Sequence, residues 1–150
     1  MTDSEFQMLL NLNKEFLKGK IKLPQVSEKA IFEVKSITTS DKFLVDIDRK
    51  SKIEFSKFKI QNRFYLTKQP LIRIDIDSPP HLNPNGIKTS RNHIHIFKED
   101  ENDTDSQSWA YNLDAYKSFN FGTEFDFNTV FFKFCEYCHI NSKNIQGVIL

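Results

Sequence analysis

Two histidines separated by one residue are the clearest sign of chemistry in this sequence. His93 and His95 flank Ile94 in the string HIHIF, and a third histidine, His81, stands twelve residues before His93. Successive side chains of a strand point to opposite faces, so an alternating strand places the two imidazoles of His93 and His95 side by side. Paired imidazoles suit the binding of a metal or a phosphate, or the relay of a proton.

A second alternating segment, IRIDID at residues 72–77, supplies carboxylates and an arginine. Its isoleucines share one face, which leaves Arg73, Asp75 and Asp77 on the other. If this strand pairs with the one at residues 93–97, the polar residues of both converge on one side of a sheet, joined by His81 from the loop. We therefore predict that the two strands are neighbours. The catalytic candidates are His81, His93, His95, Asp75 and Arg73.

Several uses of this face fit the residues. Asp75, Asp77 and His81 would complete a ligand set for metal-assisted hydrolysis, because such a set lowers the pKa of a bound water. In a metal-free nuclease, one histidine would take the proton of a ribose 2′-hydroxyl, another would protonate the leaving oxygen, and Arg73 or Arg63 would stabilise the phosphorane. A network of mutual hydrogen bonds without any reaction fits equally well. No recognised motif selects among them, and we assign no metal ligand and no cofactor.

Other residues are suited to binding nucleic acid or a protein partner. Lysines and an arginine alternate along residues 57–63 to form a basic strip, and aromatic side chains can stack on bases. A nucleic-acid-binding module of this kind needs no catalytic geometry. The binding candidates, for nucleic acid or a protein partner, are Lys57, Lys59, Arg63, Tyr65, Asn83 and Trp109.

The string CEYCH at residues 135–139 has the spacing of a c-type haem attachment site. It lies at the end of an apolar helical pattern, on a chain without an export signal, and its first cysteine falls on the face expected to be buried. We therefore predict that Cys135 is buried and that neither cysteine binds haem. A zinc or redox pair is the less favoured alternative.

The elements that position these residues can be predicted from periodicity. Thr2 and Glu5 have the spacing of a capping box, and a helix is expected over residues 3–18. Strands follow at residues 30–34 and 43–47, with a turn at 39–41, and again at 109–113. A buried helix begins after Asp126. Residues 98–107 are acidic and are expected to form an exposed, mobile loop, whereas 146–150 form either an edge strand or a docked segment.

These elements predict a single α+β domain over residues 1–150, with a mainly antiparallel, curved sheet and a helix at each end. The net charge of +1 divides into a basic first half and an acidic second half, which is compatible with a phosphate-bearing partner or with ordinary solvated surface. No run reaches the length of a membrane span, no signal peptide is present, and the two cysteines lie close together. We expect a cytoplasmic protein that does not contact membranes; its oligomeric state stays open.

Three segments carry a resemblance to a known family. RIDIDSPPHLNPNG at residues 73–86, HIHIF at 93–97 and SWAYNL at 108–113 resemble the LRLDINGPPHxNPDG, PHLHIY and KWAYPL segments of an uncharacterised family of small Firmicute and phage proteins. The similarity runs through most of the chain and includes both terminal helices. This sequence departs from the family pattern at Ser78 and Asn85, where the family has glycine and aspartate, and in the acidic insertion after Phe97. The residues that match are Arg73, Asp75, Pro79, Pro80, His81, Asn83, Pro84, His93, His95 and Trp109.

The resemblance implies a setting in phages, mobile elements or their defence systems, where small proteins are often toxins, antitoxins or inhibitors. Our leading hypothesis is a protein that acts on nucleic acid, or on a nucleic-acid-processing complex, through the His81, His93 and His95 region, with a ribonuclease-like toxin as one form. The alternative hypothesis is a non-catalytic inhibitor or antitoxin that binds a protein partner.

Overall fold

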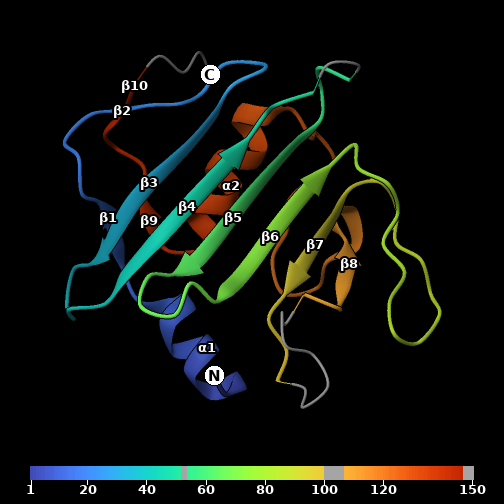
Figure 1. Ribbon diagram of the computed structural model, residues 1–150, viewed down its shortest axis with the longest axis horizontal. Coiled ribbons are helices and arrows are strands. Elements are labelled where there is room, and N and C mark those ends of the chain that lie inside the picture. Colours follow the sequence, from blue (N-terminus) through green and yellow to red (C-terminus); the bar gives the residue numbers. More distant parts are fainter. Residues whose placement is uncertain (52–53, 100–106, 147–150) are drawn as a thin grey trace.

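The computed structural model describes residues 1–51, 54–99 and 107–146. Eight strands form one sheet in the order β8-β7-β6-β5-β4-β3-β1-β9, and helix α2 lies behind its central strands in the view of Figure 1. Every neighbouring pair in this sheet is antiparallel except β1 and β9. The α+β class and the mainly antiparallel sheet are therefore confirmed, while strong curvature stays a prediction.

The helices are α1 (Asp3–Asn11) and α2 (Phe127–Tyr137), with a 3-10 turn η1 (Leu113–Ala115). The strands of the large sheet are β1 (Lys14–Phe16), β3 (Lys29–Ser36), β4 (Lys42–Asp48), β5 (Phe58–Phe64), β6 (Pro70–Ile76), β7 (His93–Ile96), β8 (Ala110–Asn112) and β9 (Ile140–Asn141). Two further short strands, β2 (Ile21–Lys22) and β10 (Ile145–Gln146), pair in parallel. The short strands β1, β2 and β9 were not expected from periodicity, whereas β10 includes Gln146, the first residue of the expected edge strand or docked segment.

Helix α1 starts where the sequence predicts, because the backbone N–H of Glu5 donates to Thr2 Oγ1 at 3.0 Å. It ends at Asn11, so the expected helix over residues 3–18 is too long. The chain turns extended at Leu12, and β1 then pairs with β3 on one side and β9 on the other. Phe16 is buried in β1, and strand pairing also satisfies the backbone of this segment, so tertiary context overrides the helical spacing.

Helix α2 forms the apolar core against one face of the sheet. Asp126 caps it by accepting from the backbone N–H of Thr129 at 3.1 Å. The predicted C-terminal helix and the burial of Cys135 are confirmed. The core also includes the inward side chains of four central strands, among them Val45, Ile60, Ile74 and Ile94.

Lys14 joins the N-terminal segment to the end of α2 from within the core. Its side chain is fully buried, and Nζ donates to the carbonyl oxygens of Leu10, Leu12 and Cys138 at 2.8–2.9 Å. Carbonyls at a helix C-terminus carry partial negative charge, which favours a cation there. Burial lowers the pKa of Lys14 to about 8.

The predicted pairing of the two alternating segments is confirmed: β6 and β7 are antiparallel neighbours, with Arg73 opposite His95 and Asp75 opposite His93. The strand expected over residues 109–113 is shorter, since Leu113 begins η1. Residues 100–106 of the expected acidic loop and 147–150 of the C-terminal segment lie outside the described residues. Within the described ranges, no helix has the length and apolar character needed to cross a membrane.

Candidate functional site

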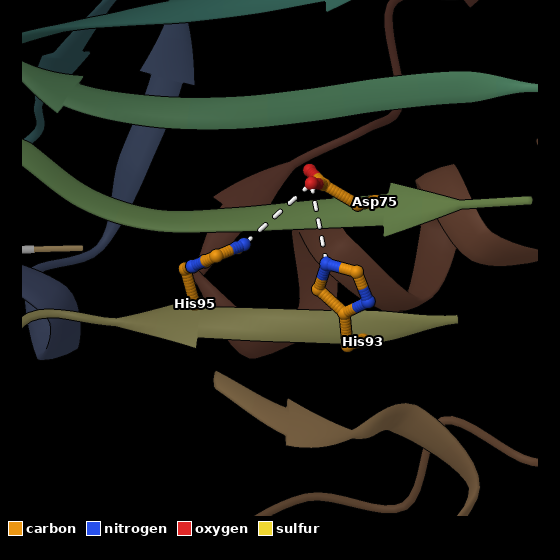
Figure 2. A group of neighbouring side chains, drawn as sticks. All are labelled: Asp75, His93 and His95. Atoms are coloured by element: carbon orange, nitrogen blue, oxygen red, sulfur yellow. Dashed lines mark ion pairs between the residues drawn. The ribbon is translucent and has the colours of Figure 1, made fainter. Parts of the chain in front are cut away.

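The candidate site lies on the sheet face opposite α2. Because β6 and β7 alternate, Ile74 and Ile94 point into the core, while Asp75, His93 and His95 project from the other face (Figure 2). These three side chains are nevertheless buried, with 3%, 1% and 2% of their residue surfaces exposed. The sequence therefore predicted which residues share a face, but not that this face is covered.

The carboxylate of Asp75 is the centre of the cluster. Arg73 donates from Nε to Oδ1 at 2.8 Å and from Nη2 to Oδ2 at 3.0 Å. Nε2 of His93 and Nε2 of His95 lie 3.3 and 3.5 Å from the same Oδ2, as the dashed lines of Figure 2 show. Burial by itself raises the pKa of Asp75, but the contacts with the imidazoles of His93 and His95, together with the charge and hydrogen bonds of Arg73, outweigh it and hold that pKa far below its usual range. Asp75 is therefore a carboxylate at neutral pH.

Backbone carbonyls fix the tautomers of the two histidines. Nδ1 of His93 lies 2.9 Å from the carbonyl oxygen of Ser90, and Nδ1 of His95 lies 2.9 Å from that of Gln107. A carbonyl oxygen only accepts, so each Nδ1 carries a proton. In the neutral imidazole, each Nε2 then presents its lone pair toward Asp75.

The two Nε2 atoms differ in what they meet. Nη2 of Arg73 lies 3.1 Å from Nε2 of His95 and donates to it, and burial together with the Arg73 charge lowers the pKa of His95. His95 is therefore neutral. Nε2 of His93 faces the Asp75 oxygen, and a lone pair and a carboxylate repel each other at 3.3 Å. A cation placed between these two atoms would relieve that repulsion.

His81 reaches the cluster from the loop between β6 and β7. Its ring centroid lies 4.7 Å from that of His95 and 6.3 Å from that of His93. The predicted convergence of three histidines is thus confirmed. Nε2 of His81 donates to the carbonyl oxygen of Ser108 at 2.7 Å. This hydrogen bond connects the loop between β6 and β7 to the segment that precedes β8.

Asn83 attaches the same loop to the sheet edge. Its Nδ2 donates to the carbonyl oxygen of Ala110 at 2.9 Å, and its Oδ1 accepts from the Ala110 backbone N–H at 2.8 Å. Both ends of the amide are therefore used within the protein. This arrangement gives Asn83 a structural task beside the binding role that the sequence suggested.

A polar network continues from the cluster across the sheet face. Gln107 accepts from Nη1 of Arg73 at 2.7 Å and donates to Gln61 at 2.9 Å. Gln61 donates to Asp46 at 3.2 Å, and Arg63 binds both oxygens of Asp46. Sequence reasoning missed Asp46 and Gln107. Alternation along β4 places Asp46 on the polar face, so Asp46 could have been found from the sequence. No local pattern points to Gln107, because its position depends on how the segment after β7 folds back onto the sheet.

A family model matches residues 1–140 of the chain, which include every residue of the cluster and the network. The chain belongs to the family of unknown function DUF6978. The other two comparisons, with curated proteins and with solved structures, found no match. The expected membership of an uncharacterised family is confirmed by this match.

The remaining binding candidates of this DUF6978 chain take no part in the hydrogen bonds of the cluster within the described residues. Lys59 stands opposite Asp75 in the register of β5 and β6, whereas Lys57 precedes the strand. The ring of Tyr65 lies near the Nζ atoms of two lysines outside the cluster. Trp109 is half-buried, with Lys98 Nζ 4.4 Å from its ring centroid. Asp77 follows β6 with a φ of 52° and takes no part in the cluster.

This arrangement restricts the chemistry. The cluster brings a carboxylate, two fixed imidazoles and a guanidinium together, but in this conformation the histidines expose too little surface to reach a substrate. General acid–base catalysis requires hydrogen-bonding reach of the reacting proton. What the geometry does provide is a buried position for a cation and, outside it, a polar sheet face.

Proposed function

We propose that the protein binds single-stranded nucleic acid on the sheet face opposite α2. The observation that carries this proposal is Tyr65, whose ring centroid lies 5.8 Å from Lys42 Nζ and 3.7 Å from Lys68 Nζ. Phe43 and Phe64 pair with their rings 5.9 Å apart on the core side, so their neighbours Lys42 and Tyr65 turn to the other face. An aromatic ring between lysines can stack on a base while the ammonium groups contact flanking phosphates.

Cations along β3 and β5 extend this surface. Lys29 and Lys59 lie in register with Asp48 between them on β4, and no ion pair joins either lysine to a carboxylate within the described residues. The guanidinium of Arg63 is neutralised by Asp46. Lysines without a bound carboxylate are the groups that can exchange counterions for phosphates, which makes such binding depend on salt.

This proposal places nucleic acid on the exposed surface and leaves the buried histidines out of direct contact. A ribonuclease would require the segments around His81 and Gln107 to move away from His93 and His95, whereas binding requires no such movement. The role suits the cytoplasmic location expected from the sequence and the phage or mobile-element setting that the family resemblance implies, including an action on a nucleic-acid-processing complex.

The test measures fluorescence anisotropy of labelled single-stranded RNA and DNA. Tyr65→Ala should weaken binding by about 1–3 kcal/mol, the usual contribution of one stacked base. Tyr111→Ala is the matched control, because Tyr111 is similarly exposed, at 41% against 37% for Tyr65, and lies on a different strand. The double variant Lys42→Glu/Lys68→Glu should reduce the salt dependence. Absent binding by the wild type, or equal losses for Tyr65→Ala and Tyr111→Ala, would refute the proposal.

A second candidate function, binding to a protein partner as an inhibitor or antitoxin, has an observation of its own. Leu82 and Ile87 are 57% and 65% exposed on either side of the turn at Asn85 and Gly86. The turn is held in place, since the Asn83 backbone N–H donates to the carbonyl oxygen of Ile87 at 3.0 Å. An ordered loop that displays two apolar side chains suits a protein interface.

The two candidates can be separated in one experiment. If a protein is the partner, Leu82→Ser/Ile87→Ser should abolish the cellular phenotype of the expressed protein, and Tyr65→Ala should leave it intact. If nucleic acid is the partner, the two variants should behave in the opposite way. Circular dichroism of each variant checks that folding is preserved.

A further inference from the structure

We propose that Asp75, His93 and His95 form a binding site for a divalent transition-metal ion of the zinc class. One ligand atom from each residue, a carboxylate oxygen or an imidazole nitrogen, lies within 4.8 Å of the others. Imidazole nitrogen together with a carboxylate oxygen is a donor set that suits zinc, iron and nickel. This inference does not depend on nucleic-acid binding.

The histidines are held as metal ligands usually are. Nδ1 of His93 donates to the carbonyl of Ser90 and Nδ1 of His95 to that of Gln107, which turns both Nε2 lone pairs toward Asp75. Metal-bound histidines in general donate their other ring N–H to a carbonyl or carboxylate, and that bond fixes the tautomer and the ring orientation. Both rings therefore need little rearrangement to bind an ion.

The spacing of the donor atoms agrees with a tetrahedral ion. Metal–ligand bonds of about 2.0–2.2 Å place neighbouring ligands about 3.3–3.6 Å apart in a tetrahedron. Oδ2 of Asp75 lies 3.3 Å from Nε2 of His93 and 3.5 Å from Nε2 of His95. The donor atoms of the two imidazoles lie within 4.8 Å of each other, so an ion can bind between the carboxylate and both rings after at most a small movement of one ring.

The guanidinium of Arg73 stands close to the position that the proposed metal ion would occupy. Its Nη2 lies 3.0 Å from Asp75 Oδ2 and 3.1 Å from His95 Nε2, so a guanidinium nitrogen already stands between two of the proposed ligands. The Arg73 side chain is 27% exposed, against 4% or less for Asp75, His93 and His95, and so it can swing toward solvent. That movement would open the entry path and leave one coordination position free.

The cysteines are a poorer site. Cys135 and Cys138 are buried on the core side, and burial raises the pKa of both thiols, that of Cys138 to about 12. Metals bind the thiolate form, so these thiols would have to lose a proton at high cost. The histidine cluster instead offers a carboxylate oxygen and two imidazole nitrogens that already face one another.

The test uses the full chain without a histidine tag, freed of metals with a chelator and titrated with Zn²⁺ by calorimetry and with Co²⁺ by absorption. One ion should bind per chain, with the strong visible absorption of four-coordinate cobalt. Asp75→Asn and His93→Ala should each weaken Zn²⁺ binding by at least about 100-fold. Failure of the wild type to bind either ion would overturn the proposal, as would a thiolate-to-cobalt charge-transfer band.

Arg73→Gln provides a test in the opposite direction and does not remove a ligand. Loss of a neighbouring positive charge should tighten Zn²⁺ binding by about tenfold or more. Arg63→Gln is the matched control: Arg63 lies on the same face, pairs with Asp46 and is 22% exposed, and its substitution should leave Zn²⁺ affinity unchanged. Equal or weaker Zn²⁺ binding by Arg73→Gln would overturn the proposal, because removing a positive charge beside a true metal site should strengthen metal binding.

Discussion

Two buried charged groups in this protein are satisfied in different ways. Lys14 has three N–H donors, and three backbone carbonyl oxygens accept them at 2.8–2.9 Å. The carboxylate of Asp75 is instead approached by Nη2 of Arg73 and by the Nε2 atoms of His93 and His95, all around one oxygen. Lys14 is thus fully paired with acceptors, whereas one oxygen of Asp75 is shared by a guanidinium and two imidazoles.

This difference separates a structural charge from a candidate functional one. A buried group whose donors are all used has no capacity left for a ligand, and its task is to hold two ends of the chain together. A buried cluster whose nitrogen and oxygen atoms converge on one point keeps a position that a cation can occupy. Burial alone therefore does not distinguish the two regions; the count of donors and acceptors does.

The strongest test of this comparison is Lys14→Met. The substitution removes the charge but leaves three buried carbonyl oxygens without donors, and we expect a loss of about 3–5 kcal/mol in the free energy of unfolding. Urea denaturation measures it. Lys18→Met, at an exposed lysine of the same segment, should change stability by less than about 0.5 kcal/mol. Similar values for the two variants would show that Lys14 does not act as a structural clamp.

Asp75→Asn tests the other region. In the absence of metal, Arg73 and the two histidines lose their common carboxylate, and we expect a cost of about 3 kcal/mol, the lower end of the range for a broken buried ion pair. Added Zn²⁺ should stabilise the wild type by mass action and leave the variant unchanged. Thermal unfolding with and without Zn²⁺ checks both statements. Asp48→Asn is the control, since Asp48 is exposed on the same sheet and should retain the wild-type response.

The two regions also differ in how much could be predicted from sequence. The convergence of Asp75, His93 and His95 follows from period-two alternation, a local pattern that survives in the fold. Lys14 falls within the helix that the sequence predicts over residues 3–18, and no local pattern distinguishes it from the other lysines there. Its partner Cys138 lies 124 residues away, so no local pattern could predict the contact.

The same reasoning applies to the segment around Gln107, which buries the histidines of the cluster. Gln107 bonds to Gln61 and Arg73, which are 46 and 34 residues distant, and the burial of the histidines depends on those long-range contacts. Alternation identifies the face of a strand but not what packs on it. For this reason the candidate residues could be predicted, and their inaccessibility could not.

A pH titration sharpens the assignment of Lys14. Its pKa is lowered from 10.5 to about 8 in the folded protein, so between these values the unfolded chain binds more protons at this residue. Stability contributed by Lys14 should therefore rise as pH increases from about 8 to 10.5, by up to about 3 kcal/mol, and should be lower at and below pH 8. The difference in unfolding free energy between wild type and Lys14→Met measures it. A difference that stays constant over this range would mean that burial does not lower this pKa.

The smallest expected effect lies at the exposed end of the polar network. Arg63 and Asp46 form a bidentate ion pair, but both side chains are more than a fifth exposed, so water screens their attraction. Arg63→Gln should therefore cost no more than about 1 kcal/mol. Arg73 makes the same kind of pair with a carboxylate that is only 4% exposed, and in metal-free protein Arg73→Gln should cost about twice as much or more. Chemical denaturation of both variants in chelator compares them directly. If the two costs are equal, the burial of Asp75 does not strengthen its bond to Arg73.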